Sequence, residues 1–123
     1  MKSKSKISKQ IEKKRHSILV ETIIVAKKHE GWLNVASILA GPIRRRINFN
    51  LDEINKNTKE GEIVIIPGKV LSQGEINKKI TIIALNFSEK AREKLLKSKT
   101  IFSTIREEIE KNPGAKNTRV LLK

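Results

Sequence analysis

Three consecutive arginines, Arg44, Arg45 and Arg46, stand between an apolar segment and a short polar one. Like charges in a row repel one another unless an anion lies against them. The guanidinium group is a planar fork of hydrogen-bond donors that matches phosphate oxygens. The arginine run therefore predicts contact with the phosphates of a polyanion.

The histidines of the sequence are poor candidates for catalysis. His16 stands in "KKRHS" and His29 in "KKHEG", so both have basic neighbours. A general base needs a partner that orients it, and neither histidine has an obvious one. Serines are common, but the sequence lacks the G-x-S-x-G elbow that carries a serine nucleophile. We therefore predict no catalytic residue and no enzyme activity.

Two further patterns fit nucleotide or metal sites poorly. The segment "GEIVIIPGKV" has six residues between Gly61 and Gly68 where a phosphate loop has four, and Val70 replaces the Ser or Thr that holds magnesium. An acidic cluster at helical spacing lies among basic neighbours and consists of Glu107, Glu108 and Glu110. We interpret this cluster as an exposed helix face offset by ion pairs. We predict no metal, no cofactor and no small-molecule substrate.

The composition supports a polyanionic partner. The chain has 123 residues, which suits one small domain, with 27 Lys and Arg against 13 Asp and Glu and a net charge of +14. Such a surplus is typical of proteins that bind nucleic acid. Aromatic residues make up only 3 %, which argues against stacking of unpaired bases on an aromatic platform. We expect binding through the phosphates and the shape of the partner.

The sequence also indicates the compartment. It has no cysteine, so it can form neither a disulfide framework nor a thiolate zinc site. Its longest apolar runs, such as "IVII" and "IIAL", are far shorter than the roughly 18 residues that span a bilayer. The basic N-terminus has no apolar stretch of the secretory type. We therefore expect an intracellular protein.

The first sixteen residues carry seven Lys or Arg and one acid. On a helix, Ile7, Ile11 and Ile18 fall on one side and lysines on the other. One face would then contact a core and the other face phosphates. A basic amphipathic helix can also lie on anionic lipid, but this segment lacks a large aromatic or Leu-rich face. We expect no membrane contact.

Two helices are expected next in the chain. Residues 18–26 are rich in apolar side chains, and Gly31 suits the left-handed position that ends a helix. A second, shorter helix over residues 34–42 has Asn34 as its predicted N-cap. We interpret Trp32 as a core anchor between the two helices. A helix-turn-helix DNA binder ranks below an RNA binder, because the arginines lie beyond the second helix.

The middle of the chain is rich in β-branched residues. Strands are predicted at "EIVII", "KVLS" and "KITIIALNF", separated by the Pro-Gly pair at 67–68 and by residues 73–78. Residues 47–50 are a further candidate strand. The chain ends in a predicted turn and a short basic strand.

Helix starts are marked by capping residues. Asn50 stands three residues before an acid and begins a short helix that we expect to end at Gly61. Ser88 is the predicted cap of the next helix. Thr104 and Glu107 form the capping box of a last helix.

The segment "KEGEIVIIPGKVLSQGEINKKITIIALNFSEKAREKL", residues 59–95, resembles the archaeal and eukaryotic large-subunit ribosomal protein eighteen, a relative of bacterial large-subunit protein fifteen. The matching positions are Pro67, Gly68, Lys69, Val70, Leu71, Gly74, Phe87, Ser88, Glu89, Ala91 and Lys94. The resemblance extends to Trp32, to residues 42–46, to "NLDEIN" and to Asn112-Pro113. Ser72 replaces an expected glycine, and "GAKNTRV" is less glycine-rich than the usual ending.

The resemblance implies a structural component of the large ribosomal subunit, cytoplasmic and without catalysis, whose partners are large-subunit ribosomal RNA and neighbouring ribosomal proteins. It implies an α+β (mixed α/β) fold: a small single domain with a core of irregular strand-strand-helix turns. Residues 1–30 would form a basic N-terminal helical extension, and residues 31–123 the core. A DNA-binding or nucleic-acid architectural protein is the alternative, and a small basic enzyme comes third.

The residues predicted to contact RNA are basic and lie in separated parts of the chain. They are Lys2, Lys4, Lys6, Lys9, Lys13, Lys14, Arg15, Arg44, Arg45, Arg46, Lys69, Lys78, Lys79, Lys116, Arg119 and Lys123.

Overall fold

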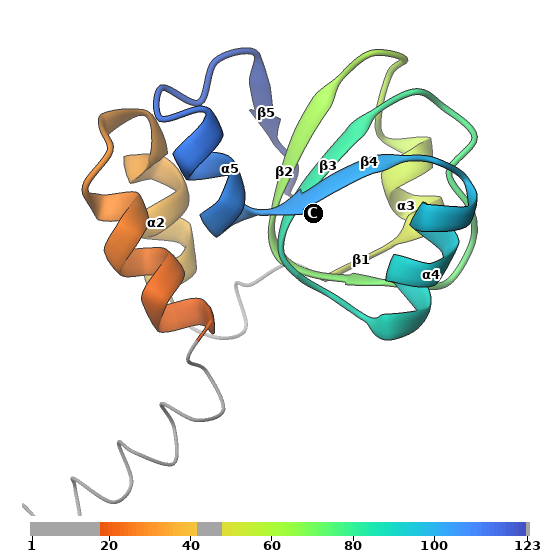
Figure 1. Ribbon diagram of the computed structural model, residues 1–123, viewed down its shortest axis with the longest axis horizontal. Helices are drawn as coiled ribbons and strands as arrows, with labels where there is room; N and C mark the ends of the chain where they lie inside the picture. Colours follow the sequence, from red (N-terminus) through yellow and green to blue (C-terminus); the bar gives the residue numbers. More distant parts are fainter. Residues whose placement is uncertain (1–17, 42–47, 123) are drawn as a thin grey trace, which may run out of the picture.

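The computed structural model describes residues 18–41 and 48–122 (Figure 1). The chain is helical over residues 18–27. The elements that follow are η1 (Glu30–Trp32), α2 (Leu33–Ala40), β1 (Phe49–Asn50), α3 (Leu51–Lys56), β2 (Ile63–Leu71), β3 (Thr81–Phe87), α4 (Glu89–Lys97), β4 (Ile101–Thr104), α5 (Ile105–Lys111) and β5 (Thr118–Val120). None of the helices in the described ranges has the length and apolarity needed to cross a membrane.

The five strands form one parallel sheet in the order β1-β2-β3-β4, with β5 also paired to β2. Two short strands share one edge of β2, because β5 pairs with Ile63–Ile65 and β1 with Val70 and Leu71. Helices α3, α4 and α5 make the connections β1 to β2, β3 to β4 and β4 to β5. The prediction of a small mixed α/β domain is confirmed; the parallel arrangement comes from the structure.

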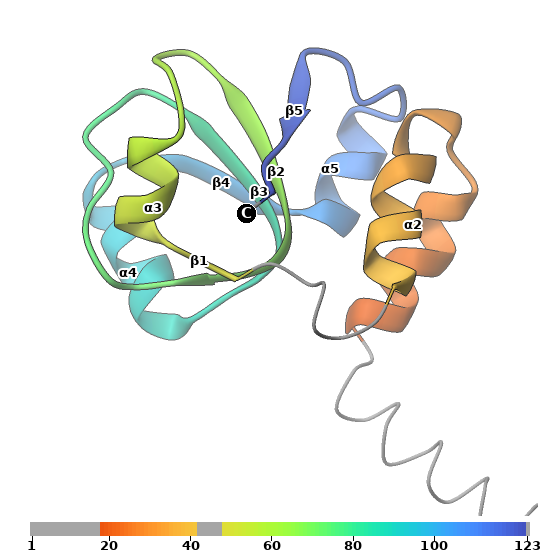
Figure 2. The same cartoon turned by 180° about the vertical axis from the view of Figure 1, so that it is seen from behind.

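Helices cover both faces of this sheet (Figures 1 and 2). Val64 and Ile66 of β2 pack into a cluster with residues of α3 and α4. Ile65 between them packs into a second cluster, with α2, α5 and the helix 18–27. Because alternate residues of a strand point to opposite faces, a strand covered on both faces is apolar at every position. The unbroken runs "IVII" and "IIAL" therefore mark the centre of the sheet.

The Pro-Gly pair lies within a strand, which corrects the prediction of two strands around it. β2 is continuous from Ile63 to Leu71, and its register with β3 shifts between Ile66 and Lys69. A bulge is one of the few places in a sheet that accept proline, because the ladder is already interrupted there. Pro67 and Gly68 therefore bend β2 without ending it.

Strand β4 is absent from the prediction. It is four residues long and lies at the edge of the sheet beside β3. Its first residue, Ile101, is 70 % exposed, so the strand lacks the apolar run that marks β2 and β3. These residues form a strand because they pair with β3. The local sequence gives no sign of this pairing.

The predicted N-caps of the three later helices are confirmed. The Ser88 hydroxyl accepts a hydrogen bond from the Ala91 amide at 3.1 Å, and capping boxes begin α3 at Asn50 and α5 at Thr104. Helix α3 ends at Lys56, before the predicted limit. Asn57 and Thr58 close it, since their side chains bond to carbonyls of its last turn. Gly61, at a φ of +85°, makes the turn that leads toward β2.

The link between the first two helices differs from the prediction. Gly31 lies in η1, and its φ is not in the left-handed region. Glycine is needed there because a Cβ atom would lie 2.5 Å from the Gly114 carbonyl oxygen. Asn34 lies inside the first turn of α2, whose N-cap is Trp32. The short η1 turn runs directly into α2, so the helix starts one residue before the expected cap.

Trp32 is the core anchor that the sequence predicts. Its side chain is 0 % exposed, and its indole Nε1–H donates to the Asn112 carbonyl at 2.8 Å. Arg106 of α5 also forms an ion pair with Glu21 of the helix 18–27. The pair of helices over residues 18–40 is therefore held against α5 both by the Trp32 hydrogen bond and by this ion pair.

Candidate nucleic-acid interface

The net charge is unevenly distributed along the chain. Residues 1–17, 42–47 and 123 contain eleven of the 27 basic residues and one of the 13 acids, which is ten of the fourteen net positive charges. The described residues contain the other sixteen basic and twelve acidic residues. The described α/β core is therefore close to neutral, and the cationic surplus belongs mostly to the segments that adjoin it.

Most of the predicted RNA contacts fall on these adjoining segments and lie outside the described residues. They are Lys2, Lys4, Lys6, Lys9, Lys13, Lys14, Arg15, Arg44, Arg45, Arg46 and Lys123, together with the expected helix through Ile7 and Ile11. Lys69, Lys78, Lys79, Lys116 and Arg119 are described.

The described ends of the chain show where the basic segments join the core. The helix 18–27 and α2 run antiparallel, so Ile18 and Gly41 lie at the same end of the helix pair (Figures 1 and 2). The basic N-terminal segment continues from the first, and the segment with the arginines from the second. On the far side of the arginines, the Asn48 side chain accepts a hydrogen bond from the Lys69 amide at 3.0 Å. The exposed Lys69 therefore lies beside the point where the arginine segment rejoins the sheet.

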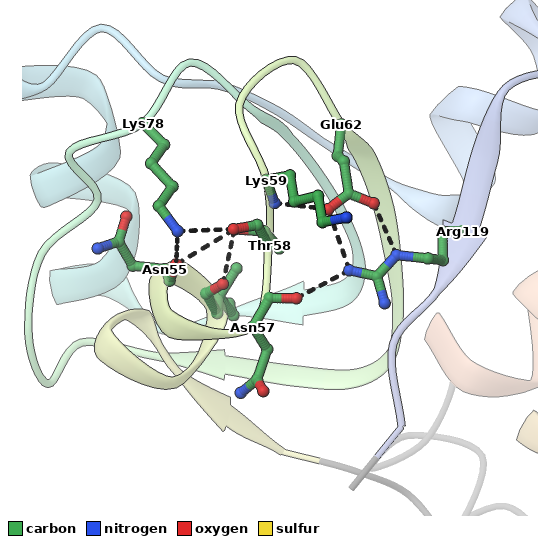
Figure 3. A network of polar contacts seen from close by, with 8 residues as sticks. Asn55, Asn57, Thr58, Lys59, Glu62, Lys78 and Arg119 are labelled. Atoms are coloured by element: carbon green, nitrogen blue, oxygen red, sulfur yellow. Dashed lines mark hydrogen bonds and ion pairs between the residues drawn. The ribbon is translucent and has the colours of Figure 1, made fainter.

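Lys78 and Lys79 differ in their surroundings although they are adjacent. The Lys78 ammonium donates to the carbonyl of Asn55, in the last turn of α3, at 2.7 Å, and to that of Thr58, just beyond the helix, at 2.6 Å (Figure 3). Lys79 is exposed, and its backbone amide donates to the Glu60 carboxylate at 2.9 Å. Lys78 therefore holds the loop 72–80 on α3.

Arg119 of β5 has a partner 57 positions away. Its Nε–H donates to Glu62 Oε2 at 2.7 Å, and its Nη2 donates to Glu62 Oε1 at 3.1 Å and to the Asn57 carbonyl at 2.8 Å (Figure 3). These bonds use three of the five guanidinium donors. Hydrogen bonding by Arg119 and by the Lys59 amide lowers the pKa of Glu62, and the carboxylate raises the pKa of Arg119.

Lys116 lies in the turn before β5. The turn is closed by Asn112, whose side chain donates to the Lys116 carbonyl at 3.0 Å and accepts from the Lys116 amide at 3.1 Å. The lysine side chain is exposed. Its position is therefore fixed by the same residue whose carbonyl accepts the Trp32 hydrogen bond.

Two lysines that the sequence prediction omits belong to the same region. Lys56 and Lys59 are exposed and line a groove of about 440 Å³ together with Asn57, Thr58, Glu62 and Arg119. The sequence signal for them is weak, because "NKNTKEG" alternates basic, polar and acidic residues. Only the fold brings Arg119 to this groove.

The described residues also limit the chemistry that the core offers. Within the ranges 18–41 and 48–122, no group of three or more His, Asp or Glu side chains has an arrangement that could hold a metal ion. The fold and the charges describe a small protein with a nearly neutral core and strongly cationic adjoining segments. A positive surplus of this size is typical of the class of proteins that bind nucleic acid.

Comparison with known proteins agrees with this class. Residues 46–98 match the family described as ribosomal proteins 50S-L15 and 50S-L18e together with their 60S counterpart. Large ribosomal subunit protein eL18 of Methanothermobacter thermautotrophicus is 36 % identical over 106 residues, which cover 84 % of this chain and 88 % of that protein. The eL18 proteins of Thermoplasma volcanium and Pyrobaculum aerophilum are 38 % and 35 % identical, over 73 % and 74 % of this chain and 74 % and 75 % of their own lengths.

The chain belongs to the family of large ribosomal subunit protein eL18. The resemblance inferred from the sequence is thereby confirmed. The family consists of structural ribosomal components, so the chain is not an enzyme. The family match at residues 46–98 runs from just before β1 to just after α4.

Proposed function

We propose that this chain is a structural component of the large ribosomal subunit in the cytoplasm, and that it binds large-subunit ribosomal RNA through phosphate contacts of its Lys and Arg side chains. The observation that carries the proposal is the distribution of charge. Ten of the fourteen net positive charges lie on segments that adjoin a nearly neutral core, and two of these segments join it at one end of the helix pair. Neighbouring ribosomal proteins are the expected protein partners.

The proposed mechanism is electrostatic. Each phosphate that a Lys or Arg neutralises releases condensed counterions, so the affinity falls with salt by a log-log slope of roughly 0.7 to 0.9 per contact. The folded core would hold the cationic segments at defined positions. Contacts from separate segments would tie neighbouring RNA strands together and screen their repulsion. The buried Trp32 leaves phosphates, rather than stacked bases, as the main targets.

The arginine run provides a direct test of the RNA contacts. The triple variant Arg44→Ala, Arg45→Ala, Arg46→Ala should bind large-subunit ribosomal RNA more weakly and with a salt slope smaller by roughly 2 to 3, because three phosphate contacts are removed. Its thermal unfolding should match that of the wild type. The control variant is Lys90→Ala, Lys97→Ala, Lys111→Ala. It removes three exposed lysines of α4 and α5 and therefore loses the same positive charge. An unchanged slope in the arginine variant would exclude this assignment.

Sedimentation tests the ribosomal role itself. A cell lysate that contains the tagged protein is sedimented through a sucrose gradient under conditions that separate the ribosomal subunits, and each fraction is probed for the tag. The experiment is done at moderate and at raised salt. We expect the protein in the large-subunit fractions at moderate salt. Protein that stays at the top of the gradient, or that follows DNA until nuclease is added, would favour the DNA-binding alternative.

A further inference from the structure

Two cations bind carbonyls at the C-terminal end of α3 and in the two residues that follow it. The free carbonyls at such an end carry the negative pole of the helix and repel phosphates. Here Lys78 donates to the carbonyls of Asn55 and Thr58, and Arg119 donates to that of Asn57 (Figure 3). Both cations come from elsewhere in the sequence. They convert a negative helix end into a surface that an anion can approach.

The groove beside this end carries an excess of positive charge. Lys56, Lys59 and Arg119 line it, and among the described residues Glu62 is the one acid in its lining. The Glu62 carboxylate already accepts from the Arg119 guanidinium and from the Lys59 amide. The positive charge of Lys59 also contributes to lowering the pKa of Glu62, after the hydrogen bonds from Arg119 and from the Lys59 amide. The two lysine side chains are exposed, whereas the Glu62 side chain is only 23 % exposed.

We infer that this groove is a second RNA phosphate-binding site, in which Lys56 and Lys59 contact the phosphate and Lys78 and Arg119 act as positioning residues. The inference rests on the proposed function, because it presupposes that the chain binds ribosomal RNA. Ammonium groups bind phosphate oxygens as mobile point charges, which suits two exposed lysines at the rim of a groove. Helix α3 packs on the opposite face of the sheet from the helix pair 18–40. The chain would therefore hold RNA from two sides.

The test compares two double variants of the full chain. Lys56→Ala with Lys59→Ala removes the proposed contacts, and Lys90→Ala with Lys97→Ala removes two exposed lysines of α4. Binding to a large-subunit ribosomal RNA transcript is measured across a salt series. We expect the slope of the groove variant to fall by about 1.4 to 1.8, which corresponds to two phosphate contacts. The slope of the α4 variant should fall by less than half of that amount.

The outcomes separate this inference from the proposed function. If the wild type binds the transcript with a steep salt slope and the groove variant keeps that slope, the inference is wrong and the proposed function stands. If the wild type itself shows no salt-dependent binding, the proposed function fails as well. Arg119→Ala adds a readout for the positioning role. Its melting temperature should fall by a small amount, because the ion pair with Glu62 is partly exposed to solvent. The two-lysine variant should melt as the wild type does, and the reverse pattern would contradict the assigned roles.

Discussion

At the scale of single residues, Trp32 joins the helix pair to the rest of the molecule. Its ring is fully buried among residues of α2, α5 and the sheet, and its indole N–H is bonded to the Asn112 carbonyl at the end of α5. A buried indole N–H needs such a partner, because an unpaired polar group in a core is unfavourable. The residue is therefore structural, as its place between two predicted helices indicates.

The variant Trp32→Phe should lower the free energy of unfolding. The variant loses the hydrogen bond from the indole to the Asn112 carbonyl, which keeps its bond from the Ala115 amide, and this loss costs about 0.5 to 1.5 kcal/mol. The smaller ring also leaves space in the core. Urea unfolding followed by far-UV circular dichroism measures the change, since Trp32 is the only tryptophan and its fluorescence is lost in the variant. RNA affinity of the folded variant should stay at the wild-type level. Lost RNA affinity at unchanged stability would instead assign the ring to base stacking.

The ion pair of Glu62 and Arg119 predicts a pH dependence. The hydrogen bond from Arg119 lowers the pKa of Glu62 below its ordinary value of 4.5. A carboxyl group with a lowered pKa in the folded state stabilises the fold above its unfolded pKa, and this contribution is lost as the pH falls through the folded pKa. The stability difference between wild type and Glu62→Gln should therefore be largest above pH 4.5 and should shrink below it.

Denaturant unfolding at a series of pH values measures this difference. Arg119→Ala serves as the matched background, because it removes the main cause of the lowered pKa. In that background the Glu62→Gln effect should be smaller and should vary less with pH. A difference that grows as the pH falls below 4.5 would contradict the assignment.

At the scale of elements, local capping signals predict the starts of the three later helices but not that of α2, whose N-cap is Trp32 instead of Asn34. The links between elements are predicted poorly. Asn50, Ser88 and Thr104 begin helices as expected, since a cap involves residues only three positions apart. The sequence predicts that Gly31 ends a helix through a left-handed φ. Its actual constraint is the backbone of Gly114, which is 83 positions away in the chain.

Substitution of these two glycines tests that contact. Gly31→Ala should lower the free energy of unfolding by about 1 to 3 kcal/mol, because its Cβ would overlap the Gly114 backbone and force a shift. Gly114→Ala is the control, since its Cβ would meet only the Lys116 side chain at 3.6 Å. Thermal unfolding of both variants measures the difference. Equal stability of the two variants would show that the turn at residues 112–118 shifts to accommodate the added Cβ atom at little cost in free energy.

At the scale of the whole molecule, the packed core and most of the positive charge belong to different parts of the chain. The buried strands of the parallel sheet, covered by helices on both faces, provide a rigid core with sixteen basic and twelve acidic residues. The segments with the remaining surplus join this core at positions that its elements define, at Ile18, Gly41 and Asn48. A nearly neutral core can pack without strong repulsion of its own charges. Most of the positive surplus is then carried by the segments that adjoin the described residues.

Properties that depend on composition, or on neighbours within one helical turn, follow from the sequence alone. These are the net charge, the N-caps of three helices, the apolar runs of the central strands and the family. The packing of the fold settled which distant residues meet: Arg119 with Glu62, Lys78 with the end of α3, and Gly31 with Gly114. It also placed Pro67 inside β2 and made residues 101–104 a strand. The physical reason is that strand pairing and side-chain partnership depend on how distant segments pack, whereas caps and apolar runs are set by local contacts and by burial.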